Sequence, residues 1–98
     1  MSEKASVTVS DNADENRYEA LDESGVVAGF SAYQKEGGLI IFTHTEVDDA
    51  FEGRGVGSAL VRGALDDVRG TGLQVRPLCP FVKSYIDGHP EYRDLLDG

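Results

Sequence analysis

Several residue types are scarce in this chain, and each scarcity excludes a class of protein. A single cysteine, Cys79, rules out an internal disulfide, so a reducing cytoplasm is the compartment we expect. The apolar runs are too short to span a membrane, and we expect no membrane partner. Lysine and arginine number 9 against 18 aspartates and glutamates. The resulting net charge of -9 argues against a nucleic-acid partner, whose phosphates require a basic surface.

What the chain does contain is enough apolar residues for one hydrophobic core. It has 98 residues, of which 40% are hydrophobic, and this predicts a single domain over residues 1–98 instead of a disordered chain. Residues 1–4 lack the apolar segment of a signal peptide, so we expect none. We expect the domain to be a monomer or a weak dimer.

The period of the hydrophobic pattern changes near Gly57. Before it, short runs of alternating apolar residues are separated by turn residues, which predicts an antiparallel meander. After it, apolar residues recur at helical spacing up to Gly70, and a short strand and a second helix follow. The expected strands cover residues 5–10, 17–22, 26–33, 39–47 and 73–78, with a turn at 11–14 and the second helix at 80–86. Since a strand–helix–strand unit implies a parallel pair, we predict a mixed α/β (α+β) fold with a five-stranded sheet and two main helices.

The most informative segment covers residues 51–60 and contains Gly53, Gly55 and Gly57. Glycines between a strand and a helix let the backbone turn tightly and leave room for a ligand. The first N–H groups of the helix lack intrahelical partners and carry partial positive charge, which favours a phosphate. The spacing fits neither a P-loop, which needs a lysine after its last glycine, nor the dinucleotide fingerprint. A compact nest of N–H groups for an anion remains.

This segment and three further motifs resemble the GNAT superfamily of N-acetyltransferases, in particular a small stand-alone single-domain subfamily with a cysteine after the last core strand. The loop resembles the acyl-CoA pyrophosphate loop, with Gly55 and Gly57 at its two small positions; Glu52 stands where Gln or Arg is usual. The other motifs lie at residues 43–47 before the loop, 77–82 after the helix and 89–92 near the end. The resemblance implies a GNAT-like fold with acetyl-CoA as cosubstrate and no metal.

The resemblance also implies which residues contact the CoA moiety. These are Val47, Glu52, Gly53, Arg54, Gly55, Val56, Gly57, Ser58 and Lys83. Because CoA is strongly anionic and the chain is acidic, local cations must contribute, and Arg54, Lys83 and Arg76 are the candidates. We expect Arg62 instead to pair weakly with Asp66, four residues later on the same helix.

Cys79 is the main candidate for covalent chemistry. As the residue before Pro80 it should be extended and stand at the N-terminus of the next helix, where the helix dipole favours a thiolate. Free cysteine is also among the most buried residues, so a structural role is the alternative. The resemblance implies that Cys79 faces the acyl thioester and that Tyr85 occupies the place of a general acid. A core position for Tyr85, with its hydroxyl at the surface, is the alternative.

His44 and Glu46 lie on the strand that leads into the loop. Strand alternation puts them on one face, opposite Thr43, Thr45 and Val47. Two titratable groups just upstream of an anion site could deprotonate an incoming ammonium. A solvated strand face is the alternative for either residue.

Three functions are compatible with these patterns. The leading one is an acetyl-CoA-dependent N-acetyltransferase acting on an unidentified amine, with an open and shallow acceptor groove because the usual helices between the first two strands are missing. A non-catalytic CoA or acyl-CoA-binding module is the alternative, and a generic phosphate or nucleotide binder is the third. We assign His89 and Tyr92 to a C-terminal turn. No cysteine–histidine cluster has the spacing of a structural zinc site, so we expect no metal.

Overall fold

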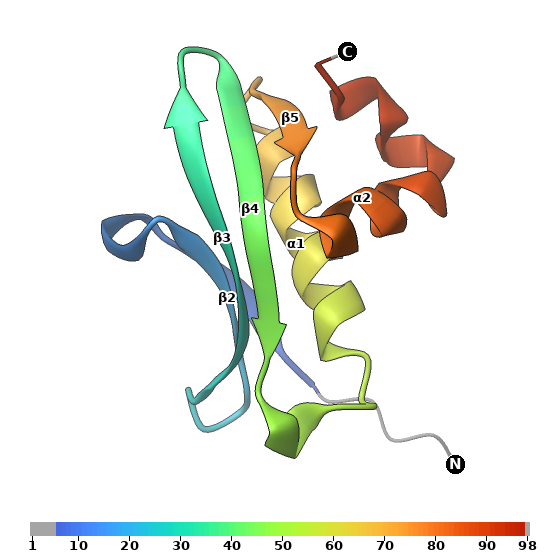
Figure 1. The fold of residues 1–98 in the computed structure, drawn as a ribbon. Helices are drawn as coiled ribbons and strands as arrows, with labels where there is room; N and C mark the ends of the chain where they lie inside the picture. Colours follow the sequence, from blue (N-terminus) through green and yellow to red (C-terminus); the bar gives the residue numbers. More distant parts are fainter. Residues whose placement is uncertain (1–5, 98) are drawn as a thin grey trace.

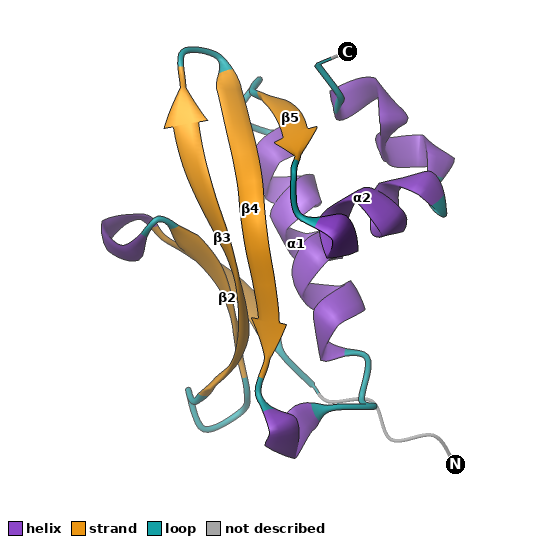
Figure 2. Cartoon of the chain, viewed as in Figure 1, coloured by secondary structure: helices purple, strands orange, loops and turns teal. Residues whose placement is uncertain are grey.

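A five-stranded mixed sheet forms one layer of the molecule (Figures 1 and 2). The computed structural model describes residues 6–97. The strands are β1 (Thr8–Asn12), β2 (Arg17–Leu21), β3 (Val27–Glu36), β4 (Leu39–Val47) and β5 (Gln74–Pro77), in the order β1-β2-β3-β4-β5. Strands β1 to β4 are antiparallel neighbours, whereas β4 and β5 run parallel. The predicted meander followed by a crossover is confirmed.

Most strand boundaries differ from the prediction by one to three residues. β1 continues through residues 11–12, where we expected a turn, and the chain turns instead in the short 3-10 helix η1 (Ala13–Glu15). The Asn12 side chain caps that helix by accepting a hydrogen bond from the Glu15 N–H at 3.3 Å. β3 extends beyond residue 33 to Glu36 because its pairing with β4 continues up to the hairpin turn. Residue 5, the start of the predicted first strand, lies outside the described residues.

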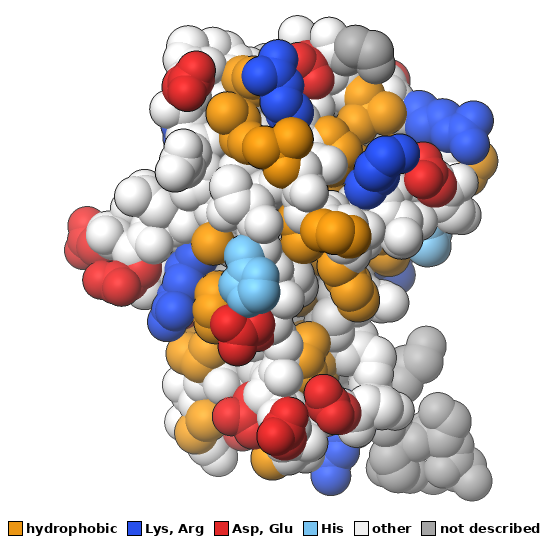
Figure 3. Space-filling view, in the orientation of Figure 1, with side chains coloured by type: hydrophobic (Ala, Val, Ile, Leu, Met, Phe, Trp, Pro, Cys, Tyr) orange, Lys and Arg blue, Asp and Glu red, His pale blue; other side chains and the backbone are white. Residues whose placement is uncertain are grey.

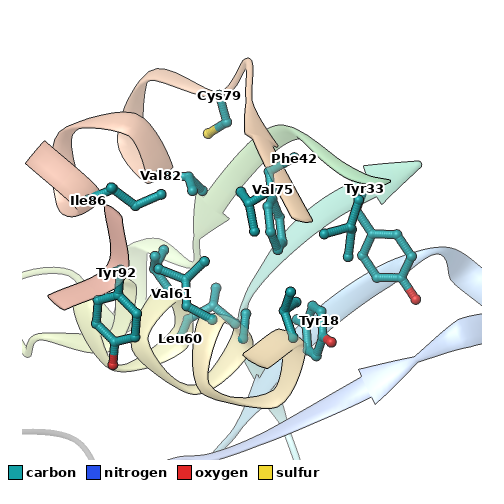
Figure 4. Packing of buried hydrophobic residues seen from close by; sticks show 14 of the residues in the cluster. Tyr18, Tyr33, Phe42, Leu60, Val61, Val75, Cys79, Val82, Ile86 and Tyr92 are labelled. Atoms are coloured by element: carbon teal, nitrogen blue, oxygen red, sulfur yellow. The ribbon is translucent and has the colours of Figure 1, made fainter. Parts of the chain in front are cut away.

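Two α-helices pack on one face of the sheet. α1 (Val56–Arg69) connects β4 to β5, and α2 (Pro80–Asp87) follows β5 beside it (Figure 1). The short helices η2 (Asp49–Phe51) and η3 (Pro90–Leu95) precede α1 and follow α2. Buried side chains from the sheet and from both helices form one cluster, with Phe42 and Val75 facing Leu60, Val61 and Val82 (Figure 4). The two predicted main helices are confirmed.

A β-bulge at Thr43 reverses the side-chain alternation along β4. The adjacent residues Ala32 and Tyr33 of β3 pair with His44 and Phe42, so Thr43 is the extra residue. Phe42 is therefore buried in the core, whereas His44, two positions further along the strand, is exposed on the opposite face. The bulge decides which side of the sheet the residues after it face.

The face of β2 to β4 that is turned away from α1 is polar and open. It carries Arg17, whose guanidinium lies 4.6 Å from the centroid of the Phe30 ring and 2.8 Å from a Glu19 oxygen. His44 and Glu46 lie on the same face, and Figure 3 shows a histidine and acidic side chains over the sheet. A shallow groove of about 240 Å3 is present here. It is lined by Arg17, Val27, Ala28, Gly29, Phe30, Glu46 and Asp48.

Candidate active site

The glycine loop between η2 and α1 has the tight geometry that its sequence predicts. Gly53 and Gly55 adopt φ values of 78° and 76°, in the left-handed region that disfavours side chains. Gly57 differs from these two, because a Cβ there would lie 2.6 Å from the end of the Phe81 ring and would displace that ring. The Phe81 ring therefore packs directly against the first turn of α1 and forms one wall of the loop.

The first turn of α1 presents free N–H groups. Gly55 is the N-cap residue and has no side chain to cap the helix, and the first turn contains no acidic residue. The first helical hydrogen bond is donated by the Ala59 N–H to the Gly55 carbonyl at 3.0 Å. Within residues 6–97, no side chain accepts from the N–H groups of Val56, Gly57 or Ser58. These uncapped donors and the helix dipole are the features on which the predicted anion site depends.

A groove of about 460 Å3 lies against this turn. Its lining is Val47, Phe51, Glu52, Gly53, Gly55, Val56, Gly57, Ser58 and Phe81. Seven of these nine residues were expected to contact CoA, and the structure brings them together. Phe51 and Phe81 were missed, because an aromatic side chain near a loop gives no sequence signal that separates a pocket wall from the core.

A second pocket, of about 490 Å3, lies against the same turn of α1 and shares Gly55 and Ser58 with the first. We call it the arginine pocket. Its lining is Arg54, Gly55, Ser58, Ala59, Arg62, Tyr85 and His89. Arg54 and Tyr85 thus lie here and not in the groove beside Phe81. The other two expected cations form ion pairs within the protein. Lys83 Nζ lies 3.5 Å from Asp87 Oδ2, and Arg76 Nη2 lies 2.8 Å from Asp97 Oδ2.

The gap between β4 and β5 leads from the loop to Cys79. The two strands pair only from Leu39 to Phe42, and the last partner is Pro77. Beyond this point the edge of β4 that faced β5 has no strand partner within the described residues. The chain then crosses back, and the Cys79 N–H donates to the Phe42 carbonyl at 2.9 Å. Pro77 and Pro80 contribute to this interruption of the ladder, because proline has no N–H to donate.

Cys79 is the N-cap residue of α2 and is extended, as expected before a proline. Its side chain, however, is only 3% exposed and belongs to the core cluster (Figure 4). The thiol lies 3.3 Å from the Thr45 hydroxyl, which shares a 3.0 Å hydrogen bond with the Ser31 hydroxyl. Sequence reasoning missed Thr45 and Ser31, because small hydroxyl residues on strands are common and only the fold brings these two to the thiol.

His44 and Glu46 form a close pair on the open face of the sheet. The His44 Nε2–H donates to Glu46 Oε2 at 2.7 Å, and the two side chains are 58% and 61% exposed. The bulge at Thr43 places this pair on the opposite side of β4 from Thr45 and Cys79. The structure therefore brings His44 and Glu46 together but separates them from Cys79 by the thickness of the sheet.

Tyr85 stacks on His89 in the arginine pocket, which Arg62 also lines. The ring centroids are 3.9 Å apart with an interplanar angle of 10°. His89 Nδ1–H donates to the Tyr85 carbonyl at 2.7 Å, which fixes the imidazole against the phenol ring. Burial raises the pKa of Tyr85, so its hydroxyl stays protonated at neutral pH. His89, which we had assigned to a C-terminal turn, also lines a pocket.

The described part of the chain contains neither a group of metal-binding side chains nor a membrane-spanning helix. No group of three or more histidine, cysteine, aspartate or glutamate side chains in residues 6–97 is placed to hold a metal ion. Among the helices of the same residues, none has the length and apolarity to cross a membrane.

Together these features define a class of protein. The chain is a small α/β domain in which a glycine turn offers uncapped helix amides to an anion, next to a gap between two parallel strands. It belongs to the GCN5-related N-acetyltransferase family, whose family model matches residues 17–95. The resemblance noted in the sequence is thereby confirmed, and family membership supports an acyl-transfer function.

Known proteins similar to this chain agree with that assignment. Protein NATD1 of Homo sapiens is 36% identical over 52 residues, which cover 53% of this chain and 46% of the human protein. Protein NATD1 of Gallus gallus matches equally, over 47% of its length, so the chain spans about half the length of these relatives. A solution NMR structure from Staphylococcus aureus, described as GCN5-like, superposes with a TM-score of 0.68 at 23% identity, covering 97% of this chain and 90% of that one. This last likeness confirms the fold.

Proposed function

We propose that the protein transfers an acetyl group from acetyl-CoA to the nitrogen of an amine. The observation that carries the proposal is the uncapped first turn of α1, which opens next to the gap between β4 and β5. Membership of the family supports acyl transfer in general. The acyl donor and the kind of acceptor are the parts that we propose.

In this proposal the diphosphate of CoA binds the N–H groups of Val56, Gly57 and Ser58. The pantetheine arm then extends along the unpaired edge of β4, past the end of β5. That arm contains amide groups, and free backbone groups on the strand edge offer them hydrogen-bond partners. The thioester would then lie near Cys79 and Thr45, where the gap ends.

Transfer requires a neutral amine, whose nitrogen lone pair attacks the thioester carbonyl. A C–N bond forms, the C–S bond breaks with its electron pair leaving on the CoA sulfur, and the amine nitrogen loses a proton. We propose His44 as the base that takes this proton, because its hydrogen bond to Glu46 orients the imidazole. The acceptor would approach from the open face of the sheet, where the groove lined by Glu46 and Asp48 suits a cation.

Cys79 and Tyr85 have proposed roles as well. In a covalent route the Cys79 thiolate would take the acyl group first, release the CoA thiol and pass the acyl group to the amine. Because this side chain is 3% exposed, we favour direct attack by the amine. For Tyr85 we propose the role of an acid toward the leaving thiolate, because a phenol hydroxyl carries its proton at neutral pH.

Replacing Ser58 with glutamate tests the anion site. Ser58 is exposed in the first turn of α1 and lines both pockets. A carboxylate in the first turn stabilises a helix by about 0.3–1 kcal/mol, but it repels a phosphate at the same place. We therefore expect Ser58→Glu to unfold at equal or higher urea concentration and to bind acetyl-CoA at least about tenfold more weakly in calorimetry, a loss of about 1.4 kcal/mol.

The neutral variant Ser58→Gln is the matched control and should bind nearly as the unmodified protein does. Equal affinity of Ser58→Glu and Ser58→Gln for acetyl-CoA would sink the proposed anion site. A thermal-shift comparison with ATP addresses the generic phosphate binder, because stabilisation by ATP and not by acetyl-CoA would favour that alternative.

A non-catalytic acyl-CoA-binding module is the second candidate. Two observations favour it: Glu52 replaces the usual Gln or Arg, and only the three-residue η1 separates β1 from β2. Turnover of acetyl-CoA with a panel of amines decides between the two. An enzyme should lose turnover in His44→Gln while it keeps its affinity for CoA, whereas a binding module has no turnover to lose.

A further inference from the structure

Five side chains form a row of contacts across the open face of the sheet. Glu19 and Arg17 on β2 are joined by a hydrogen bond of 2.8 Å, and the Arg17 guanidinium lies 4.6 Å from the centroid of the Phe30 ring on β3. On the β4 side, the centroids of the Phe30 and His44 rings are 6.1 Å apart, and His44 contacts Glu46 at 2.7 Å. Figure 3 shows basic, apolar, histidine and acidic side chains next to one another on this face.

The register of three strands brings these side chains to one face. The two glutamates of the row pair directly with Phe30, and the arginine and the histidine pair directly with Ala32. Residues that pair directly across neighbouring strands point to the same side of a sheet. The row therefore follows from the pairing of β2, β3 and β4, and it places a cation on β2 opposite a histidine–carboxylate pair on β4.

Arg17 is held in place and still has hydrogen-bond donors to offer. Its Nε–H donates to Glu19 Oε2, which also accepts from Asn12 Nδ2 at 3.1 Å. Glu19 is buried, and the side chain of Arg17 is 30% exposed. In the part of the chain that the structure describes, neither Nη group of Arg17 donates a hydrogen bond. A guanidinium fixed at one edge and stacked on a ring can bind a carboxylate through its remaining donors.

The groove on this face is lined by both signs of charge, and we call it the open-face groove. Arg17 reaches it from β2, Phe30 lies between, and Glu46 and Asp48 reach it from β4 and the residue after β4. Each of these two carboxylates uses one oxygen within residues 6–97, toward a histidine and a backbone N–H, and keeps the other free. The groove has a volume of about 240 Å3, which suits a molecule smaller than a drug-sized ligand.

We propose that the acetyl acceptor is a small amine that also carries a carboxylate, that is, an amino acid. Its ammonium lies against Glu46 and Asp48, its carboxylate accepts from the Nη groups of Arg17, and its carbon chain lies on Phe30. The inference rests on the proposed function, because it names the acceptor of that reaction. The ammonium and acetyl-CoA together give the N-acetylated acid, the CoA thiol and one proton. The product has lost the positive charge that the two carboxylates hold, which favours its release.

Four amines built on one carbon chain test the class of acceptor. δ-Aminovalerate and norvaline are isomers, and each becomes butylamine when its carboxylate is replaced by hydrogen. Putrescine carries a second ammonium in place of the carboxylate of δ-aminovalerate. We expect CoA thiol release with a kcat/KM at least about tenfold higher for the better of the two isomers than for butylamine or putrescine, because only the isomers can pair with the guanidinium. The better isomer shows whether both charges lie on one carbon or at the two ends of the chain.

The role of Arg17 is tested with Arg17→Gln. This variant should raise the KM of the better isomer and abolish its preference over butylamine, because the carboxylate loses its partner. Since the change leaves the buried Glu19 without its cation, the double variant Arg17→Gln, Glu19→Gln removes both charges and should lose the same preference. Lys35→Gln also removes a cation that lies over an aromatic ring, at 5.3 Å from the centroid of Tyr33, and as the matched control it should keep the preference.

The outcomes separate this inference from the proposed function. A kcat/KM for butylamine or putrescine equal to or above that of both isomers would overturn the inference and leave N-acetylation intact, and so would turnover of other amines with neither isomer accepted. A preference that survives in both Arg17 variants would overturn it as well. Absence of turnover with every amine would reject the proposed function and the inference together.

Discussion

At the residue scale, the side chains around Cys79 form a short buried polar chain. The Cys79 thiol, the Thr45 hydroxyl and the Ser31 hydroxyl follow one another at 3.3 and 3.0 Å, and Ser31 is fully buried. Each member depends on its neighbour, because an unsatisfied buried hydroxyl is costly. Thr45 therefore positions the thiol, and Ser31 positions Thr45.

Thr45→Val tests this dependence. The change keeps the shape of the side chain but leaves the Ser31 hydroxyl without its partner, so we expect a loss of about 1–3 kcal/mol in the free energy of unfolding. Adding Ser31→Ala removes the stranded hydroxyl, and the double variant should lose clearly less than the sum of the two single losses. Urea denaturation measures all four proteins, and strictly additive losses would show that the two hydroxyls do not depend on each other.

At the element scale, α1 packs against β1 so closely that one helix position must be glycine. A Cβ at Gly63 would lie 2.6 Å from Val9 Cγ2 and 2.7 Å from Val9 Cβ. The Val9 Cβ is bonded to the backbone and cannot move away unless the strand moves. Glycine in the middle of a helix is otherwise unfavourable by about 0.5–1 kcal/mol relative to alanine, so its presence here marks a close contact between two elements.

At this scale we predict that Gly63→Ala destabilises the protein. Helix propensity alone would stabilise the variant, but the contact with Val9 should outweigh it and cost about 1–3 kcal/mol. Shortening the neighbour in the double variant Gly63→Ala, Val9→Ala should recover part of that loss. Gly38→Ala, where a Cβ meets no atom within 4 Å, is the control. A Gly63→Ala variant more stable than the unmodified protein would contradict the packing of α1 on β1.

On the scale of the whole molecule, tyrosine–aspartate hydrogen bonds tie distant segments together. Tyr18 on β2 donates to Asp67 on α1, and Tyr92 on η3 donates to Asp66 on α1, both at 2.6 Å. Tyr33 on β3 donates to Asp11 on β1 at the same distance. Burial, together with these hydrogen bonds, raises the pKa of Tyr18 and Tyr33, and it raises that of Tyr92 from 10.0 to about 12.

These shifts predict that the fold weakens in alkali. Because the folded state holds the phenol protons more tightly than the unfolded state, the stabilisation is fully present below pH ~10 and is lost as the pH rises through the folded pKa values. We expect the urea midpoint to fall steadily between about pH 10 and 12, in step with tyrosinate absorbance. Tyr92→Phe should start about 1 kcal/mol less stable and decline less steeply. A flat midpoint over that range would contradict the raised pKa values.

Much of the fold and of the anion site follows from local patterns in the sequence. Alternating and helical periodicities predict the meander, α1 and α2, since they reflect which side chains must leave water. The glycines at 53, 55 and 57 predict the loop because backbone freedom is a property of the residue itself. The bulge at Thr43 has no such local signal, because pairing with β3 forms it, and it turns His44 and Glu46 to the face opposite Cys79.

The sequence by itself determined the elements, the glycine turn before α1 and the family, because these depend on residues close together in the chain. Only the tertiary structure decided that Thr45 and Ser31 lie next to Cys79. The same holds for the hydrogen bond of Asp66 with Tyr92 in place of a pair with Arg62, and for the pocket that Arg62 and Tyr85 share. Such contacts join segments far apart in the chain, and they arise from packing helices on a sheet, which no local pattern encodes.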